Sequence, residues 1–281
     1  MEIYKTAKQM QERSLYWESQ GWRIGFVPTM GYLHEGHTAL MRECRKRCDI
    51  LVVSIFVNPI QFDNASDLAN YPRNEESDMS VCRKAGVNAV YFPTPDAMYP
   101  PGYRTYVDVH EMTSILCGAS RAGHFRGVTT VCTKLYNTVR PAVAVFGEKD
   151  FQQLAVIRRM VEDLNLPIEI VGHPTVREKD GLAMSSRNAR LGAQDRINAL
   201  SIYHALKNAA VSVAAGEFDA GKLISDARQT IEAAGSAGID YIEIRNPDSL
   251  LELERVEGPA QMFIAAHFGP VRLIDNMKIS A

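Results

Sequence analysis

The sequence has little cysteine, and its cysteines follow no disulfide or metal pattern. There are five, an odd number, and no Cys-x-x-Cys pair occurs among them. This spacing argues against a disulfide framework and against a zinc site made of cysteine thiolates. We therefore expect a protein that works in a reducing cytoplasm.

The sequence also lacks long apolar runs and a strong excess of charge. No stretch approaches the ~20 consecutive apolar residues that span a bilayer, and the first residues form no apolar signal-peptide core. The formal net charge is −2, so nothing attracts the chain in bulk to nucleic acid. We expect no export, no membrane and no nucleic acid as a partner.

The sequence does contain a series of apolar runs that are rich in β-branched residues. The 281 residues suffice for two domains or one large α/β unit. Continuous apolar runs are typical of parallel strands that are covered on both faces. We therefore predict an α/β fold with a Rossmann-like, parallel-sheet N-terminal domain over residues 1–174. The predicted strands are 23–27, 49–57, 87–92, 142–146 and 168–171, with a short one over 104–109, and the predicted helices are 1–20, 38–45, 74–86, 128–139 and 151–164.

The pattern changes after about residue 174. Two helical stretches, 193–215 and 218–235, are followed by three short strand-like runs over 239–245, 261–267 and 271–274. This order predicts a smaller α+β C-terminal domain over residues 175–281.

The chain is organised around the stretch from Phe26 to His37. A strand-like run leads through a glycine-containing turn into a helix, and His34 and His37 lie at that turn. Free backbone N–H groups and the positive end of the helix dipole make such a turn a phosphate site. An imidazole with a pKa near ~6.5 can donate to a phosphate at neutral pH. The alternative is a simple turn with two surface or capping histidines.

Three further loops carry polar side chains at comparable positions. Asn58 and Gln61 follow a buried strand and suit a hydroxyl or carboxylate, although a simple Asn-Pro turn is the alternative. Lys149 follows another strand as a mobile charge for phosphate, and Asp150 could cap the next helix or hold a metal. The loop 179–188 places two serines beside Arg187 and could wrap a triphosphate, or simply cap a helix.

Together these stretches resemble the pantothenate synthetase (pantoate–β-alanine ligase) family over essentially the whole chain. His-x-Gly-His alone is typical of a wider nucleotidyl-transferase superfamily. The Asn-Pro-x-Gln-Phe and Gly-Glu-Lys-Asp stretches narrow the resemblance to this ligase family. The matching segments are Pro28–Gly31, His34–His37, Ser54–Phe62, Tyr71–Arg73, His124–Gly127, Phe146–Gln153, Lys179–Arg187 and Arg272–Asn276.

The resemblance implies a two-step, ATP-dependent amide synthesis. Pantoate's carboxylate would attack the α-phosphate of ATP to give pantoyl adenylate and pyrophosphate, and β-alanine would then release AMP and pantothenate. Fixed electrostatic donors would stabilise the charge that builds up on the triphosphate. The resemblance also implies Mg²⁺, a homodimer formed through the N-terminal domain, and a closing loop or domain that keeps water from the adenylate.

Residue roles carry over from the resemblance position by position. His34, His37, Lys149 and Arg187 would be catalytic, with His37 as the proton donor to the departing pyrophosphate. Gln61 and Gln153 would hold pantoate, with Asn58, Tyr71 and Arg121 nearby in the pantoate and β-alanine site, and Asp150 would lie near Mg²⁺. ATP would contact Met30, Gly31, Tyr32, Leu33, His34, Glu35, Gly36, His37, Gly147, Glu148, Lys149, Asp150, Val176, Met184, Ser185, Ser186 and Arg187.

One segment departs from the family. Leu116-Cys117-Gly118 stands where Leu-Glu-Gly is common, and Ala122 stands where proline is common. A thiol cannot pair with Arg121 as a carboxylate does. The sequence therefore does not predict whether this position takes part in binding β-alanine.

Two other functions fit part of the sequence. A plain nucleotidylyltransferase would keep the nucleotide on its product, but Gln61 and Gln153 beside an ATP site speak against it. A non-catalytic nucleotide sensor would tolerate loss of His37 or Lys149, and both are present. A tRNA synthetase is disfavoured because no anticodon-binding extension or basic domain occurs.

Overall fold

The computed structural model describes residues 1–235 and 238–280, which form two compact units. The first unit contains Met1–Thr113, Arg121–Glu148 and Val156–Pro174. The second contains Ser114–Ser120, Lys149–Ala155 and Thr175–Ala281. The second unit thus takes in two short segments that come before the domain boundary predicted after residue 174.

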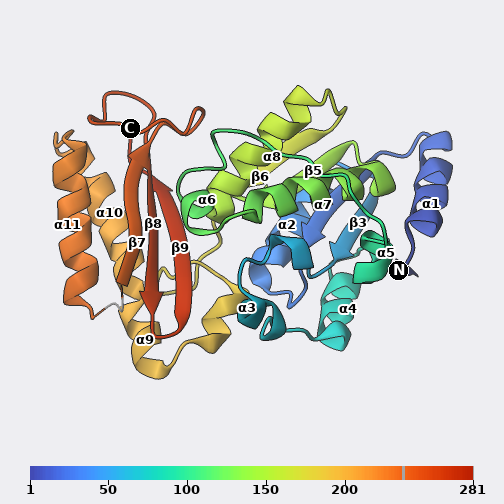
Figure 1. Cartoon of the computed structure of the whole chain (residues 1–281), viewed down its shortest axis with the longest axis horizontal. Coiled ribbons are helices and arrows are strands. Elements are labelled where there is room, and N and C mark those ends of the chain that lie inside the picture. The colour runs from blue at the N-terminus through green and yellow to red at the C-terminus, as the bar shows by residue number, and fades with distance from the viewer. Residues whose placement is uncertain (236–237, 281) are drawn as a thin grey trace. The chain divides into compact units, whose positions relative to one another are not determined.

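The first unit is built on a six-stranded sheet in which every pairing is parallel (Figure 1). This confirms the predicted Rossmann-like α/β fold. The strand order is β1-β4-β3-β2-β5-β6, so the chain steps outward from β2 in one direction and later returns to its other side. The carboxyl ends of β2 and β5 therefore flank a topological switch point, where open α/β sheets bind ligands. The strands are β1 (Glu2–Tyr4), β2 (Ile24–Thr29), β3 (Ile50–Ile55), β4 (Ala89–Tyr91), β5 (Val143–Gly147) and β6 (Glu169–His173).

Helices cover both faces of this sheet because successive strand residues point to opposite sides. Phe26 packs edge-on against Tyr136 of α7, with ring centroids 6.4 Å apart. Its neighbour Val27 faces the other way, into an apolar cluster with Met41 of α2 and Met79 of α4. The helical elements of this part of the chain are α1 (Ala7–Ser19), α2 (Glu35–Arg45), η1 (Pro59–Gln61), α3 (Ala65–Ala69), α4 (Glu75–Lys84), α5 (Pro95–Met98), α7 (His124–Val139), η2 (Glu148–Asp150) and α8 (Phe151–Asp163).

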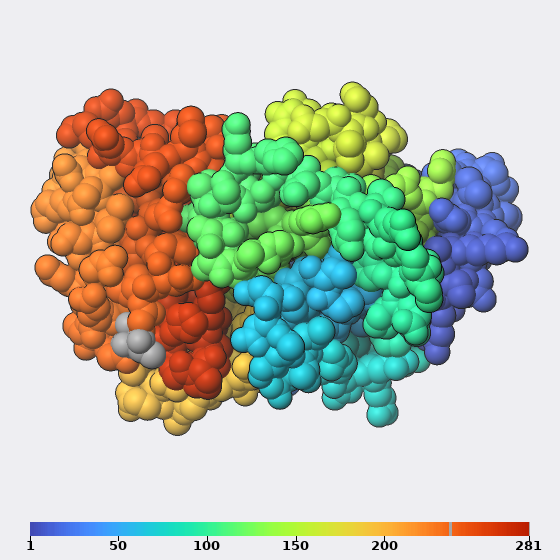
Figure 2. Space-filling view, viewed as in Figure 1, coloured from blue at the N-terminus to red at the C-terminus, as the bar shows by residue number. Residues whose placement is uncertain are grey.

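Two predictions for the first unit are wrong. Residues 104–109 form no strand, because side chains of α7 bind their backbone: Thr130 accepts the N–H of Val107 at 3.0 Å, and Thr129 donates to its carbonyl at 2.7 Å. Residues 1–20 are not one helix, because Glu2–Tyr4 pair with β4 before α1 begins. Figure 2 shows α1 at the surface of its unit.

The second unit contains a three-stranded antiparallel sheet, β7-β8-β9, with α10 and α11 packed against it. Its apolar core joins Ile202 and Leu206 of α10 and Ile231 of α11 to Ile264 and Phe268 of β8. This agrees with the predicted α+β C-terminal part. The elements are α6 (Cys117–Ser120), η3 (Ser186–Arg190), α9 (Ala193–Asn198), α10 (Leu200–Ala214), α11 (Ala220–Ala233), β7 (Gly238–Arg245), β8 (Gln261–Phe268) and β9 (Val271–Lys278).

Two boundaries in the second unit differ from prediction. The helix expected over 193–215 is interrupted after α9, where the N–H of Ile202 bonds to Ala199 only three residues back, at 3.3 Å. The last strand does not stop at Ile274, because Asp275 and Asn276 pair with Ile264 and Phe263 of β8 and keep polar partners for their side chains. Among the described residues, no helix is both long and apolar enough to cross a membrane.

Candidate active site

The His-x-Gly-His turn begins helix α2 with a reciprocal cap made of two imidazoles. Nδ1 of His34 accepts the backbone N–H of Gly36 at 3.1 Å, and Nδ1 of His37 accepts the backbone N–H of His34 at 3.2 Å. The ring centroids lie 4.2 Å apart. Two N–H groups that a helix start leaves without intrahelical partners are thereby bound.

This cap fixes the tautomer of both rings. A ring nitrogen that accepts a hydrogen bond carries no proton, so neutral His34 and neutral His37 both hold their proton on Nε2. The structure therefore bears out the capping interpretation without opposing the phosphate one. Capping uses Nδ1 of each ring, and Nε2–H is the group suited to a phosphate oxygen.

The turn before the helix is held from α4 by one buried carboxylate. Asp78, 2% exposed, accepts the N–H groups of Tyr32 at 2.9 Å and Leu33 at 2.7 Å. Gly31 has a φ of 82° and Tyr32 a φ of 51°, so two successive residues take the left-handed conformation. A Cβ at Gly31 would also lie 2.9 Å from Oδ2 of Asp78. The turn Met30–Leu33 is thus specified both by glycine and by Asp78.

Asp78, which holds this turn by two hydrogen bonds, was not predicted from the sequence. Burial raises its pKa, and the bonds from Leu33 and Tyr32 oppose this only in part. The available signal was a third acidic residue in the first turn of α4, next to the buried Met79. Pattern alone could not separate it from the exposed Glu75 and Glu76.

Gln61 is oriented by Asn58 and Met30. Asn58, 1% exposed, donates from Nδ2 to Oε1 of Gln61 at 3.0 Å and to the carbonyl of Gly127 at 3.1 Å, and it accepts from the Tyr99 hydroxyl at 2.8 Å. Nε2 of Gln61 points at Sδ of Met30, 3.0 Å away. Asn58 therefore orients Gln61, and the ligand contact expected for Asn58 itself stays a prediction.

Arg121 and His124 hold the backbone of the same loop. His124 Nδ1 lies 2.8 Å from the carbonyl oxygen of Gln61, which can only accept, so this nitrogen carries the proton. Arg121 donates to the same carbonyl at 3.3 Å and forms an ion pair with Asp63 at 3.1 Å. Arg121 and His124 thus both bind the backbone carbonyl of Gln61.

Two close contacts complete the Gln61 loop. Tyr71, also predicted at the substrate site, is buried and packs edge-on against Phe62 at 5.6 Å. Helix α7 approaches so closely that a Cβ at Gly127 would lie 2.5 Å from the carbonyl oxygen of Ile60. Only glycine allows this distance.

The Gly-Glu-Lys-Asp turn follows β5. Gly147 ends that strand, and Glu148 opens the short helix η2. In the second unit, Nζ of Lys149 lies 3.7 Å from Oδ1 of Asp150, and the Lys149 carbonyl accepts from Nδ2 of Asn276 at 2.9 Å. The backbone of this lysine is therefore fastened to β9.

The serine loop is shaped by a short hairpin. Arg177 and Ala183 form an antiparallel bridge, and the N–H of Met184 bonds to the carbonyl of Val176 at 2.9 Å. Ser185 caps η3 by accepting the N–H of Arg187 at 3.3 Å. Ser186 and Arg187 follow in η3, and each of these residues interacts with other residues of the protein.

The two adjacent glutamines of α8 differ. Gln152 is buried and binds the backbone of 114–120, accepting from Cys117 N at 3.0 Å and donating to Ile115 O at 2.8 Å. Gln153, the predicted pantoate ligand, is only partly buried. The role of Gln152 in holding a loop was not predicted.

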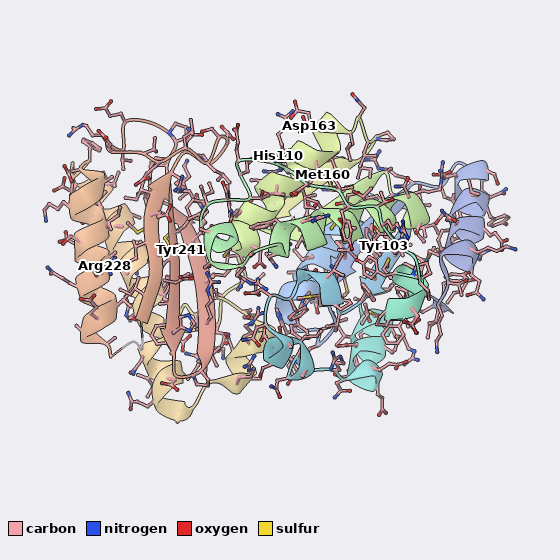
Figure 3. The ribbon with its side chains drawn as sticks, viewed as in Figure 1. Tyr103, His110, Met160, Asp163, Arg228 and Tyr241 are labelled. Carbon is pink, nitrogen blue, oxygen red and sulfur yellow. The ribbon has the colours of Figure 1, made fainter. Side chains whose placement is uncertain are left out.

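Cys117 contacts the sheet of the second unit. Its Sγ lies 3.1 Å from the hydroxyl of Tyr241, which Figure 3 labels on β7, and 3.6 Å from Arg272, which itself pairs with Asp240 at 2.6 Å. Burial raises the pKa of Tyr241, so its hydroxyl stays neutral. The guanidinium beside Cys117 is thus that of Arg272, whereas Arg121 pairs with Asp63.

Known proteins resemble this chain along its full length. It is 54% identical over 279 residues to the pantothenate synthetase of Syntrophotalea carbinolica, covering 99% of both chains. The solved pantothenate synthetase of Thermus thermophilus matches 100% of both chains with a TM-score of 0.94 and 39% identity. The solved pantoate–β-alanine ligase of Francisella tularensis, in complex with β-γ ATP and β-alanine, has a TM-score of 0.84 and 33% identity, covering 99% of this chain and 98% of that one.

A parallel sheet with a histidine-bearing turn at its switch point defines a nucleotide-handling α/β enzyme. The family model for pantoate–β-alanine ligases matches residues 2–278. The chain belongs to that family, and it is an ATP-dependent ligase that makes pantothenate.

Proposed function

We propose that the chain forms pantothenate through a pantoyl-adenylate intermediate. A carboxylate is a poor acyl electrophile, and attack on the α-phosphate of ATP turns its oxygen into part of a good leaving group, AMP. Pyrophosphate leaves in the first step, and the amine of β-alanine displaces AMP in the second. The observation that carries the proposal is the imidazole cap at α2, which keeps two Nε2–H donors at the phosphate-binding end of a helix.

In the first unit, the turn Met30–His37 would hold the triphosphate. The groups that would bind phosphate are the helix start at Glu35 and the two imidazoles. The N–H groups of Tyr32 and Leu33 instead bind Asp78 and shape the turn. His34 would stabilise phosphate charge, and His37 would protonate the departing pyrophosphate. Gln61, oriented by Asn58, would bind pantoate beside Met30, with Tyr71 and Arg121 supporting this loop.

In the second unit, Lys149 would neutralise phosphate charge and Gln153 would bind pantoate. Arg187 would pair with phosphate oxygens, as a planar guanidinium does well. Val176 and Met184 to Ser186 would complete the nucleotide loop, with Gly147 and Glu148 of the preceding turn on the ATP as well. The support for these assignments is the family membership and the folded loops described above.

The residues present suit a magnesium ion that arrives with the nucleotide. Among the described residues, no group of three His, Cys, Asp or Glu side chains could hold a metal. Mg²⁺ usually binds through one or two carboxylates and substrate phosphates. Asp150 beside Lys149 offers one such carboxylate. A bound ion would offset charge on the triphosphate.

The experiment that tests the proposal separates the two half-reactions. With ATP, Mg²⁺ and pantoate alone, we expect exchange of pyrophosphate into ATP, and AMP with pantothenate only when β-alanine is added. If pantoate supports no exchange while the complete mixture makes pantothenate, the free adenylate step is refuted. A nucleotidylyltransferase would instead release no AMP upon addition of β-alanine.

Three further features belong to the proposal. We expect a homodimer, supported by the family resemblance and tested by light scattering, where a monomer would contradict it. We place the enzyme in the cytoplasm, in keeping with five free cysteines. We divide it at residue 174 into a nucleotide and pantoate domain and a lid domain, which limited proteolysis with and without ATP would test.

A further inference from the structure

Strand β9 contacts every separate segment of the second unit through neighbouring polar residues. The three segments are Ser114–Ser120, Lys149–Ala155 and the chain from Thr175 onward. Arg272, Asp275 and Asn276 each bind a different one of them by side chain. These residues belong to the motif Arg272–Asn276, whose role the proposed function leaves unexplained.

Asn276 fastens the turn that carries Lys149. The carbonyl of Lys149 can only accept a hydrogen bond, so the Asn276 atom 2.9 Å away must be its donor, Nδ2. Oδ1 of Asn276 then faces Gln261, whose Nε2 donates to it at 2.6 Å. Asn276 and Gln261 are both buried. The carbonyl of Lys149 therefore fixes the orientation of the Asn276 amide, and the Asn276 amide fixes that of Gln261.

Asp275 fastens the hairpin that leads into the serine loop. Its two oxygens accept from the guanidinium of Arg177 at 2.6 and 3.1 Å. Arg177 also donates to the carbonyl of Gly181 at 3.1 Å and forms the bridge with Ala183 that precedes Met184. The carboxylate is almost wholly buried, so a bidentate guanidinium is the partner it requires.

Arg272 fastens the third segment at the start of the strand. It donates to Oγ of Ser120 at 3.2 Å, lies 3.6 Å from Sγ of Cys117, and is held by Asp240. The three contacts are separate, so each can be removed without removing the other two.

We propose that Asp275 and Asn276 are positioning residues for the nucleotide, holding the Arg177 hairpin and the Lys149 turn in register on one strand. The inference rests on the proposed function, in which Lys149 and the loop Met184–Arg187 meet ATP. Two consecutive strand residues would thus set the spacing between the two loops. Neither side chain is assigned a contact with substrate.

The test is Asn276→Asp, which keeps the acceptor for Gln261 but replaces the donor to Lys149 with an oxygen. We expect the KM for ATP in pantoate-dependent pyrophosphate exchange to rise roughly tenfold, the size of one lost buried hydrogen bond, and the KM for pantoate to change less. Asn246→Asp is the matched control, because Asn246 uses its oxygen to accept from Asp248 and Ser249. It should leave both KM values unchanged.

Asp275→Asn gives a second, independent reading. It leaves Arg177 without a charged partner and should also raise the KM for ATP. If Asn276→Asp does not fold, Asn276→Ala removes the donor without adding a charge. An unchanged KM for ATP in folded variants, or an equal rise for ATP and pantoate, overturns the proposal. Absence of exchange in the wild type would instead refute the adenylate function itself.

Discussion

Nδ1 of His37 accepts the backbone N–H of His34, and the two rings lie 4.2 Å apart between centroids. The side chain of His37 thereby caps the start of α2, where His34 is the N-cap residue. The two roles of His37 use different nitrogens of its ring: Nδ1 caps the helix, and Nε2–H is the proposed proton donor. Substitutions can therefore separate them.

The first prediction compares His37→Ala with His37→Gln. Glutamine at this third helical position can reach back to the N-cap N–H, so His37→Gln should keep the wild-type unfolding free energy, whereas His37→Ala should lose about 1 kcal/mol. Alanine has no donor at this position, and the glutamine amide can donate a hydrogen bond but cannot give up a proton, so both variants should lose roughly 10²–10⁴-fold in turnover. Urea unfolding and AMP release measure the two effects. Full turnover by His37→Gln would contradict the acid role.

The second prediction concerns pH and Asp78. Burial holds its folded pKa above the ordinary 3.8, so ionisation costs more in the folded state than in the unfolded chain. Its pH-linked contribution is complete below 3.8 and is lost as pH rises through the raised folded pKa. Asp78→Asn cannot titrate. The unfolding free energy of the wild type should therefore fall with rising pH, relative to that of Asp78→Asn, across that window. Urea unfolding at several pH values measures both, and the same pH dependence for the two proteins would contradict the prediction.

The third prediction is that Gly127→Ala destabilises the Gln61 loop. A Cβ would lie 2.5 Å from the carbonyl oxygen of Ile60, and backbone atoms must move to admit it. We expect a loss of about 1–3 kcal/mol and a raised KM for pantoate. Gly258→Ala is the control, because a Cβ there meets nothing within 4 Å. Equal melting temperatures for the two variants would refute the close contact.

The fourth prediction is that Tyr99→Phe weakens pantoate binding through Asn58. The variant removes the donor to Oδ1 of Asn58 and should cost about 1 kcal/mol, seen as a severalfold rise in the KM for pantoate. Tyr106→Phe, at an exposed tyrosine, should change nothing measurable. If both variants bind pantoate like the wild type, Asn58 does not depend on Tyr99.

The sequence predicted well those elements whose residues are all in one kind of environment, such as strands buried on both faces. The runs at Ile50–Ile55 and Val143–Gly147 are apolar on both faces, and they became central strands of a parallel sheet. The run 104–109 is also rich in β-branched and aromatic residues, but hydroxyls of α7 bind its backbone instead of a neighbouring strand. Strand pairing depends on partners that a local pattern does not contain.

The site residues follow the same rule. The histidines at the start of α2 could be predicted because strand, turn and helix are adjacent in sequence. Asp78, 46 residues from Tyr32, could not, and neither could the hydrogen bond by which Asn58 orients Gln61. Both depend on contacts made only after folding.

The attachments of β9 have a consequence for the order in which the protein is made. Lys149 is separated from Asn276 by 127 positions, and Arg177 from Asp275 by 98. On the ribosome the parallel sheet of the first unit can form early, because its strands are synthesised first. The lysine turn and the serine hairpin gain their anchors only when β9 emerges. A nascent chain can therefore fold in large part before these two loops are anchored.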